Sequence, residues 1–159
     1  MSSSTEGRQA PRYLDIADRV WPATRRFMGV HTFLYQRSGG RLGHTIPGVP
    51  GKMLLLDHIG AKSGTKRTSP LLYVRDGEDL VIVASKGGFP KHPAWYHNLL
   101  ANPDVTVQVG SKKLPVHARV AKPEERDRLW KLAVAGYHGY EDYRARTDRE
   151  IPLVVLEPR

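Results

Sequence analysis

Short strand-like segments separated by tight turn signals fill most of the chain after residue 51, and this pattern constrains the fold most. The strand-like runs are residues 52–60, 67–77, 79–85, 104–110, 113–121 and 151–157. Asp76-Gly77 and Gly110-Ser111 are turn pairs of the kind that joins antiparallel neighbours. Parallel strands would need long crossover connections between them. The pattern therefore predicts a mainly β fold with flanking helices, built as a small antiparallel barrel or bent sheet.

Helical periodicity is confined to segments outside or between these runs. The helix-like segments are residues 13–37, 94–102, 123–137 and 140–148. Residues 1–12 are rich in Ser, Gly and Pro, which is typical of a disordered tail. The 159 residues are therefore expected to form a tail over 1–12, an N-terminal amphipathic helix over 13–37 and one barrel domain over 38–159.

Arginines flank the apolar face of the N-terminal segment, and two interpretations follow. Arg25, Arg26 and Arg37 stand beside Phe27 and Phe33. A cationic amphipathic helix of this composition lies well in a membrane interface, which would give peripheral membrane contact through residues 13–37. Such apolar faces more often pack on a protein core. Periodicity alone leaves both interpretations open.

Charge and cysteine content limit the class of protein. The 25 Lys and Arg outnumber the 16 acids and give a net charge of +9, which favours a nucleic acid, an acidic membrane or a polyanionic small molecule as partner. Alternatively, the net positive charge only promotes solubility. No cysteine is present, which excludes disulfides and thiolate chemistry. Because the sequence has neither a signal-peptide pattern nor a long apolar run, we expect a cytoplasmic protein.

Metal and hydrolytic chemistry are disfavoured by spacing. His92 and His97 are five residues apart and no HExxH pattern occurs, so no metal is expected. No G-x-S-x-G nucleophile elbow is present either.

Two basic, glycine-containing loops stand out instead. "GAKSGTKRTSP" carries Lys62, Lys66 and Arg67, but Thr65 occupies a position where a P-loop requires Gly. "SKGGFPKHPAWYHNL" places Lys86 and two glycines just before a helix that starts near Trp95. Backbone amides, cations and a helix N-terminus bind oxyanions, and an indole face suits a planar ring. Together the loops predict an elongated ligand with an aromatic end and an anionic end. A solvated hairpin that binds no ligand would have a sequence similar to that of the first loop.

Three tyrosines spaced by three residues form another candidate feature. Tyr137, Tyr140 and Tyr143 lie on one face of a predicted helix. They either pack against the barrel or line a pocket for an apolar planar substrate.

These motifs together resemble a known family. "ASKGG", "P-x-W-Y-x-N-L-x-A-N-P" and "Y-x-x-Y-x-x-Y" occur in order, and the chain from about Gly51 to Pro158 resembles the deazaflavin-dependent nitroreductase family of actinobacteria. The resemblance implies a split β-barrel related to FMN-binding barrels. It also implies reduced coenzyme F420, a deazaflavin with a phosphate and an oligoglutamate tail, and an oxidoreductase that transfers a hydride to an enone, quinone or nitroaromatic acceptor. Leu72 departs from the family pattern, in which a tyrosine often stands there.

The resemblance also implies the site residues. The cofactor-binding residues would be Lys62, Ser63, Arg67, Thr68, Ser69, Pro70, Leu71, Leu72, Val83, Ala84, Ser85, Lys86, Gly87, Gly88, Ala94, Trp95, Tyr96, His97, Asn98 and Tyr140. Tyr137, Tyr140 and Tyr143 would line the pocket of a small apolar acceptor, with Tyr140 and Ser85 as the catalytic residues.

Two alternatives remain at this point. An FMN-dependent oxidoreductase on the same barrel has less use for so basic a stretch as 62–67, because FMN carries one phosphate. A basic nucleic-acid-binding module would need a recognition motif that the sequence lacks, so no nucleic acid is expected as partner.

Overall fold

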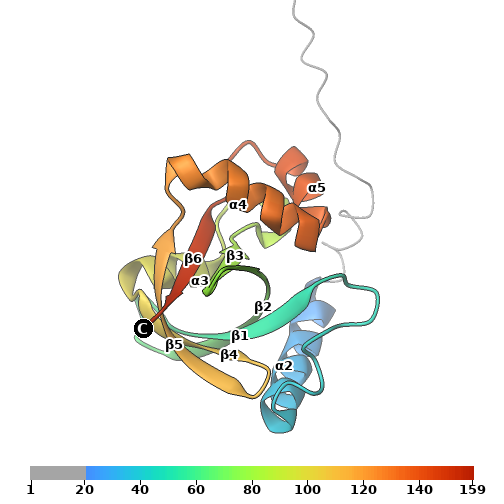
Figure 1. Cartoon of the computed structure of the whole chain (residues 1–159). Coiled ribbons are helices and arrows are strands. Elements are labelled where there is room, and N and C mark those ends of the chain that lie inside the picture. Colours follow the sequence, from blue (N-terminus) through green and yellow to red (C-terminus); the bar gives the residue numbers. More distant parts are fainter. Residues whose placement is uncertain (1–20) are drawn as a thin grey trace, which may run out of the picture.

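The strands close into a barrel. The computed structural model describes residues 21–159, so the predicted tail over 1–12 and the start of the predicted helix over 13–37 lie outside the described residues. The strands are β1 (Lys52–Ile59), β2 (Lys66–Asp76), β3 (Asp79–Val83), β4 (Asp104–Val109), β5 (Lys112–Val120) and β6 (Leu153–Pro158). They form a closed barrel in the order β1-β2-β3-β6-β5-β4, with antiparallel neighbours throughout (Figure 1). The barrel alternative of the sequence prediction is therefore confirmed.

Strand β1 shows how the barrel and a helix divide one apolar run between them. Leu54 and Leu56 point into the barrel core, whereas Met53 and Leu55 belong to a separate cluster outside it. Because successive side chains of a strand point to opposite faces, the uninterrupted apolar run requires cover on both sides. The outer cover comes from α2 (Trp21–Ser38), whose Tyr35 is fully buried against these residues.

Two further helices cover another part of the barrel. The helix α4 (Pro123–Gly136) and the helix α5 (Gly139–Arg146) lie together on one side of it, as Figure 1 shows. Leu129, Trp130 and Tyr140 from these helices pack with apolar side chains of β3 and β6 in a second core cluster. A short helix, α3 (Ala94–Ala101), and a single 3-10 turn, η1 (Lys86–Gly88), complete the described elements.

The hydroxyl of Tyr35 fixes α2 to the barrel. It accepts a hydrogen bond from the backbone N–H of Gly110 at 2.7 Å and lies 3.1 Å from the carbonyl of Met53, to which it donates. The ring of His44 approaches the same hydroxyl through Nδ1 at 3.1 Å. One phenol thus joins the helix, the start of β1 and the β4–β5 turn.

The other face of α2 is open. Phe27, Val30, Phe33 and Leu34 are all more than 40% exposed and follow one another at helical spacing. Core packing therefore accounts for one side of this helix, and these apolar side chains of the second side stay largely exposed. Within residues 21–159, no helix combines the length and the apolar character that a membrane span requires.

Candidate active site

A buried polar chain joins the β1–β2 turn to α3. The side chain of Asn98 accepts a hydrogen bond from the backbone N–H of Ala61 at 2.9 Å and donates to Nδ1 of His58, also at 2.9 Å. The other ring nitrogen, Nε2, lies 2.9 Å from the hydroxyl of Ser69 on β2. The two basic loops of the sequence are thereby held at one end of the barrel, because α3 directly follows the second loop.

His58 is neutral in this chain of hydrogen bonds. Burial, and next the charge of Arg67, lower the pKa of its imidazole. A neutral ring accepts through Nδ1 and donates through Nε2, which matches the amide of Asn98 on one side and the hydroxyl of Ser69 on the other. Both ring nitrogens are thus engaged within the protein, and the imidazole joins β1 and β2 to α3.

The cations of the two loops have no acidic partner among residues 21–159. Lys62, Lys66, Arg67 and Lys91 are exposed, Lys86 is half-buried, and none of them takes part in an ion pair within this range. We call these five the loop cations. A cluster of unneutralised charge at one end of a barrel is a field that attracts polyanions. The donor set fits the phosphate and carboxylates of a polyanionic cofactor.

Glycines keep the first loop open. Gly64 has φ +67°, a left-handed conformation that favours glycine, and a Cβ added there would meet no atom within 4 Å. The backbone of this turn is therefore accessible to a ligand.

The three tyrosines of the sequence pattern are brought together. The hydroxyls of Tyr137 and Tyr143 lie 3.0 Å apart, and the ring of Tyr137 meets that of Tyr140 edge-on at 5.0 Å. Tyr140 is only 7% exposed, and burial raises the pKa of its phenol. Within the described part of the chain its hydroxyl has no hydrogen-bond partner. It stays protonated near neutral pH and can donate to a ligand.

Other predicted cofactor residues lie partly in the protein core. Trp95 is 7% exposed and packs in the barrel interior, where Leu71 also contacts the core. Leu72 points to the opposite side and packs beneath α2. Val83 belongs to the cluster under α4 and α5. Alternation along β2 thus separates neighbouring predicted residues onto two faces, so Leu71 and Leu72 cannot present their side chains to the same surface.

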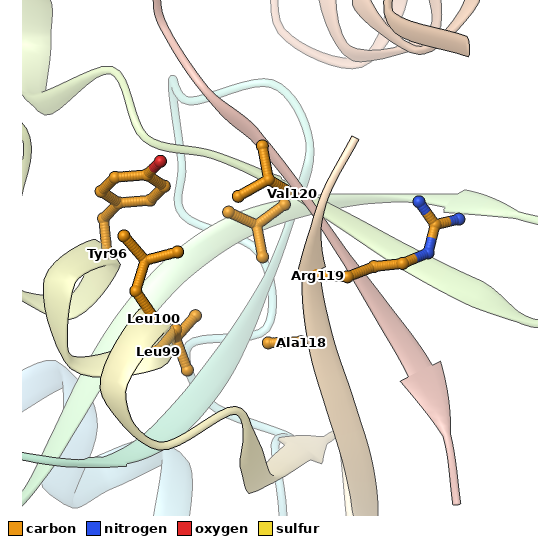
Figure 2. A pocket seen from close by; sticks show the side chains of 7 residues that line it. Tyr96, Leu99, Leu100, Ala118, Arg119 and Val120 are labelled. Atoms are coloured by element: carbon orange, nitrogen blue, oxygen red, sulfur yellow. The ribbon is translucent and has the colours of Figure 1, made fainter. Parts of the chain in front are cut away.

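A hollow beside α3 is too small to be the cleft. It lies between α3 and β5 and is lined by Tyr96, Leu99, Leu100, Ala118, Arg119, Val120 and Val154 (Figure 2). Its volume is about 10 Å³, which is room for roughly one water molecule. Tyr96 was predicted to border the cofactor, and its side chain lines this hollow.

Two arginines that sequence reasoning missed fasten the second loop. Arg146 donates to the carbonyl of Gly87 at 3.3 Å, and Arg149 donates to the carbonyl of Ser85 at 2.7 Å. No local motif marks these arginines, because their partners are backbone carbonyls about 60 residues away in the chain. His58 was missed as well, because its partners are side chains 11 and 40 residues away in the chain.

Comparison with known proteins identifies the family. The sequence profile of the family described as F420H(2)-dependent quinone reductase matches residues 24–158. The chain belongs to this family. The fold, the oxidoreductase activity and the use of coenzyme F420 that the sequence predicted are confirmed by this membership.

Individual members of the family are closely similar. An F420H(2)-dependent quinone reductase of Mycobacterium tuberculosis is 46% identical over 137 residues, which cover 84% of this chain and 91% of that protein. A solved F420-H2 dependent reductase (FDR-A) is 50% identical, covers 66% of this chain and 93% of its own, and superposes with a TM-score of 0.62. Another solved structure, described as a domain-swapped dimer, is 42% identical over 89% of this chain and 98% of its own, with a TM-score of 0.65.

Proposed function

We propose that this member of the family reduces a quinone-type acceptor in a cleft bounded by the β1–β2 turn, the loop between β3 and α3, the start of α3 and the tyrosine cluster. The observation that carries the proposal is the set of loop cations without acidic partners, held at one end of the barrel by the hydrogen-bond chain through Asn98. The quinone class comes from the names of the family and of its M. tuberculosis member.

The first loop would hold the anionic end of the cofactor. Lys62 and Arg67 would pair with the phosphate and carboxylates, and the hydroxyl of Ser63 would add a hydrogen bond. Lys86 would approach from the second loop. The stretch from Thr68 to Leu71 and the start of α3 would border the ring, whereas the side chain of Leu72 packs beneath α2 and that of Trp95 packs in the barrel interior. What supports this division is charge: the cations gather on the loops, whereas β2 beyond Ser69 is apolar as far as Val74.

The acceptor would lie against the tyrosine cluster. When bound, reduced coenzyme F420 supplies a hydride to the acceptor. The hydroxyls of Tyr140 and Ser85 have no hydrogen-bond partner among the described residues, so each can donate to an acceptor oxygen and polarise it. Tyr137 and Tyr143 would supply apolar walls that orient a planar ring. The protein thus contributes orientation and a polarising hydrogen bond.

Cofactor titration tests this assignment and separates it from the FMN alternative. We expect coenzyme F420 to bind about tenfold or more tightly than FMN, because its tail reaches cations that one phosphate cannot. The affinity should fall as salt rises, since exposed charges are screened. Equal affinities, or salt-independent binding of F420, would contradict the placement of the tail on the first loop. Oxidation of the bound reduced cofactor by a quinone and by an enone in the same samples would rank the acceptors.

A second proposal concerns α2, whose open face would rest on an anionic membrane at its cytoplasmic side. Arg25, Arg26 and Arg37 are exposed beside this face, and a pocket of about 180 Å³ lies between the helix and residues 43–47. Apolar side chains flanked by arginines are the pattern of an interfacial helix. A lipophilic acceptor would then be delivered from the bilayer.

Co-sedimentation with anionic liposomes tests this second proposal. Replacing Phe27 and Phe33 by Ser should release the protein from the liposomes. The control pair Leu100→Ser and Val120→Ser, at positions 56% and 41% exposed away from α2, should not. If both double variants bind the liposomes like wild type, or both lose binding to the same extent, α2 does not bind the membrane and has a packing role alone.

A further inference from the structure

One arginine spans both ends of the loop between β3 and α3. Arg149 lies between α5 and β6, and its guanidinium donates to the carbonyls of Ala84 at 3.2 Å, Ser85 at 2.7 Å and Phe89 at 2.9 Å. It also donates to Nδ1 of His92 at 2.9 Å. Four of its five N–H groups are therefore directed at acceptors distributed from residue 84 to residue 92.

The positive charge of Arg149 is met by neutral groups only, among the residues that the structure describes. No carboxylate within 21–159 forms an ion pair with it, and its neighbour Glu150 pairs with Arg126 instead, at 3.5 Å. Burial lowers the pKa of the Arg149 guanidinium. The pKa of the His92 imidazole is also lowered, mainly by its own burial and next by the charge of Arg149. His92 is thus neutral and accepts the hydrogen bond. An arginine commonly pairs with a carboxylate, but the guanidinium of Arg149 instead donates to acceptors of the loop between β3 and α3 and so holds that loop in place.

The loop that Arg149 holds is strained at Lys86. Lys86 has φ +45°, the one positive φ outside glycine in the described residues, and Gly87 and Gly88 follow at +62° and +78°. A left-handed conformation is strained for a residue with a Cβ, so it persists only where neighbouring contacts enforce it. The carbonyl of Ser85 belongs to the same peptide plane as the N–H of Lys86. By fixing that carbonyl, Arg149 fixes the plane that sets the φ of Lys86.

The loop is also pressed against α5. A Cβ added to Gly88 would lie 2.7 Å from the carbonyl of Tyr143, and the guanidinium of Arg146 lies over the ring of Phe89 at 5.2 Å. The tyrosine cluster and the basic loop therefore share one rigid contact. A change in the loop would alter the distance between the cofactor side and the acceptor side of the proposed cleft.

We propose that Arg149 is a positioning residue, which holds residues 84–92 in the strained conformation that presents Ser85 and Lys86 to the cofactor and acceptor. The inference rests on the proposed function of this loop in cofactor binding. Lysine cannot replace the arginine, because one ammonium presents its donors from a single point and cannot reach four acceptors in a plane.

The test compares Arg149→Lys with wild type in the full chain. Hydrogen exchange of the amides of Gly88 and Phe89, which donate to Ser85 and Lys86 at 2.9 and 3.2 Å, reports the loop directly. We expect exchange about tenfold faster and affinity for coenzyme F420 about tenfold weaker, with other amides unchanged. Adding Lys86→Gly should restore much of the protection of the loop, since glycine adopts φ +45° without strain.

Arg126→Ala provides the matched control. It removes the partner of Glu150 in the same segment but touches no atom of the loop, so exchange at Gly88 and cofactor affinity should both stay at the wild-type level. Guanidinium added to Arg149→Ala should restore affinity, and should have no effect on Arg126→Ala.

The outcomes distinguish this inference from the proposed function. Unchanged loop exchange in Arg149→Lys overturns the positioning role. A looser loop with unchanged F420 affinity also overturns it, provided that Lys86→Met still weakens the cofactor, and the proposed function then stands. If Arg149→Lys and Lys86→Met both leave the affinity unchanged, the loop is not part of the cofactor site, and the proposed function fails together with the inference.

Discussion

Beside the proposed cleft, the loop cations have no acidic partner and the hydroxyl of Tyr140 has no hydrogen-bond partner among residues 21–159, whereas several charged side chains of the frame around the barrel are paired. The loop cations and the hydroxyl of Tyr140 belong to the first region. In the second region, Arg119 pairs with Glu125 and with Glu157, and Arg128 pairs with Asp76 at 2.7 Å. The difference indicates that these charges of the frame are neutralised within the protein, without a ligand. On the proposed function an anion would neutralise the loop cations, so the same kind of side chain would stabilise the fold in one region and bind a ligand in the other.

Tyr140 and Tyr35 repeat this difference in two buried phenols. Tyr35 is fully buried and its hydroxyl joins α2 to the barrel through Gly110 and Met53. Tyr140 is nearly as buried, but its hydroxyl has no partner within residues 21–159. The first phenol is therefore expected to govern stability and the second to govern turnover.

The largest effect should come from reversing charge in the first loop. Lys62→Glu with Arg67→Glu should weaken binding of coenzyme F420 by roughly 100-fold at low salt, because two attractive contacts become repulsive. Lys112→Glu with Lys113→Glu changes the net charge by the same amount on the β4–β5 turn and should change affinity far less. Fluorescence titration of the cofactor measures both. Equal losses would mean that the overall charge attracts the cofactor, and the loop would lose its special role.

Removal of the unpartnered hydroxyl of Tyr140 should slow turnover without affecting the fold. Tyr140→Phe should reduce the rate of acceptor reduction about 10- to 100-fold, which corresponds to about 1.4 to 2.7 kcal/mol of transition-state stabilisation. Cofactor affinity and melting temperature should change little. Stopped-flow oxidation of the reduced cofactor by a quinone gives the rate. If the single-turnover rate does not change, Ser85 becomes the remaining candidate for the polarising group.

Removal of the paired phenol should have the opposite effect. Tyr35→Phe leaves the N–H of Gly110 without its acceptor, so the free energy of unfolding should fall by about 1 to 3 kcal/mol. Turnover measured below the melting temperature should match wild type. Urea unfolding with a parallel rate assay checks both values, and a slowed enzyme of normal stability would reverse the assignment of the two tyrosines.

The two regions should also lose stability in different ranges of pH. Burial lowers the pKa of His58, so the unfolded chain binds protons first, and stability should fall as pH drops below about 6.5. In the frame, the hydrogen bond from Arg119 lowers the pKa of Glu125 to about 2, and its contribution should be present above about pH 4.5 and lost as pH falls toward 2.

Variants separate the two ranges of pH. His58→Gln should flatten the stability curve just below about pH 6.5 and leave the part of the curve that depends on Glu125 intact. Glu125→Gln should do the reverse. Thermal unfolding across pH measures the slopes, and a curve unchanged by His58→Gln would assign the near-neutral loss to other histidines.

The smallest effect is expected at an exposed pair of the frame. Arg128 is 60% exposed in its side chain, so Arg128→Gln should change the free energy of unfolding little and leave cofactor affinity unchanged. The same urea unfolding and titration assays apply. If Arg128→Gln loses affinity for the cofactor, cations outside the loop cations also attract it, and the contrast between the two regions is weaker.

Local pattern predicted the elements well but predicted the surroundings of individual side chains less well. The strand β3 was expected over 79–85 and ends at Val83, while β1 and α3 agree with prediction to within one residue. The side chain of Trp95, expected against the ligand, packs in the barrel interior. Periodicity tells which residues share one face of an element. It does not tell whether that face meets the core or a cleft, because that depends on the partner element.

The amino-acid sequence by itself determined the antiparallel barrel, the two basic loops and the family, because turn pairs, strand alternation and motif order are local properties of the chain. Only the tertiary structure decided which cations lack acidic partners, which phenol is left unpartnered and that Arg149 reaches the loop from residue 84 to residue 92. The contacts of Arg149 join groups about 60 residues apart, three of them through backbone carbonyls. Every residue has a backbone carbonyl, so no residue type in the sequence marks such a contact; barrel closure creates it.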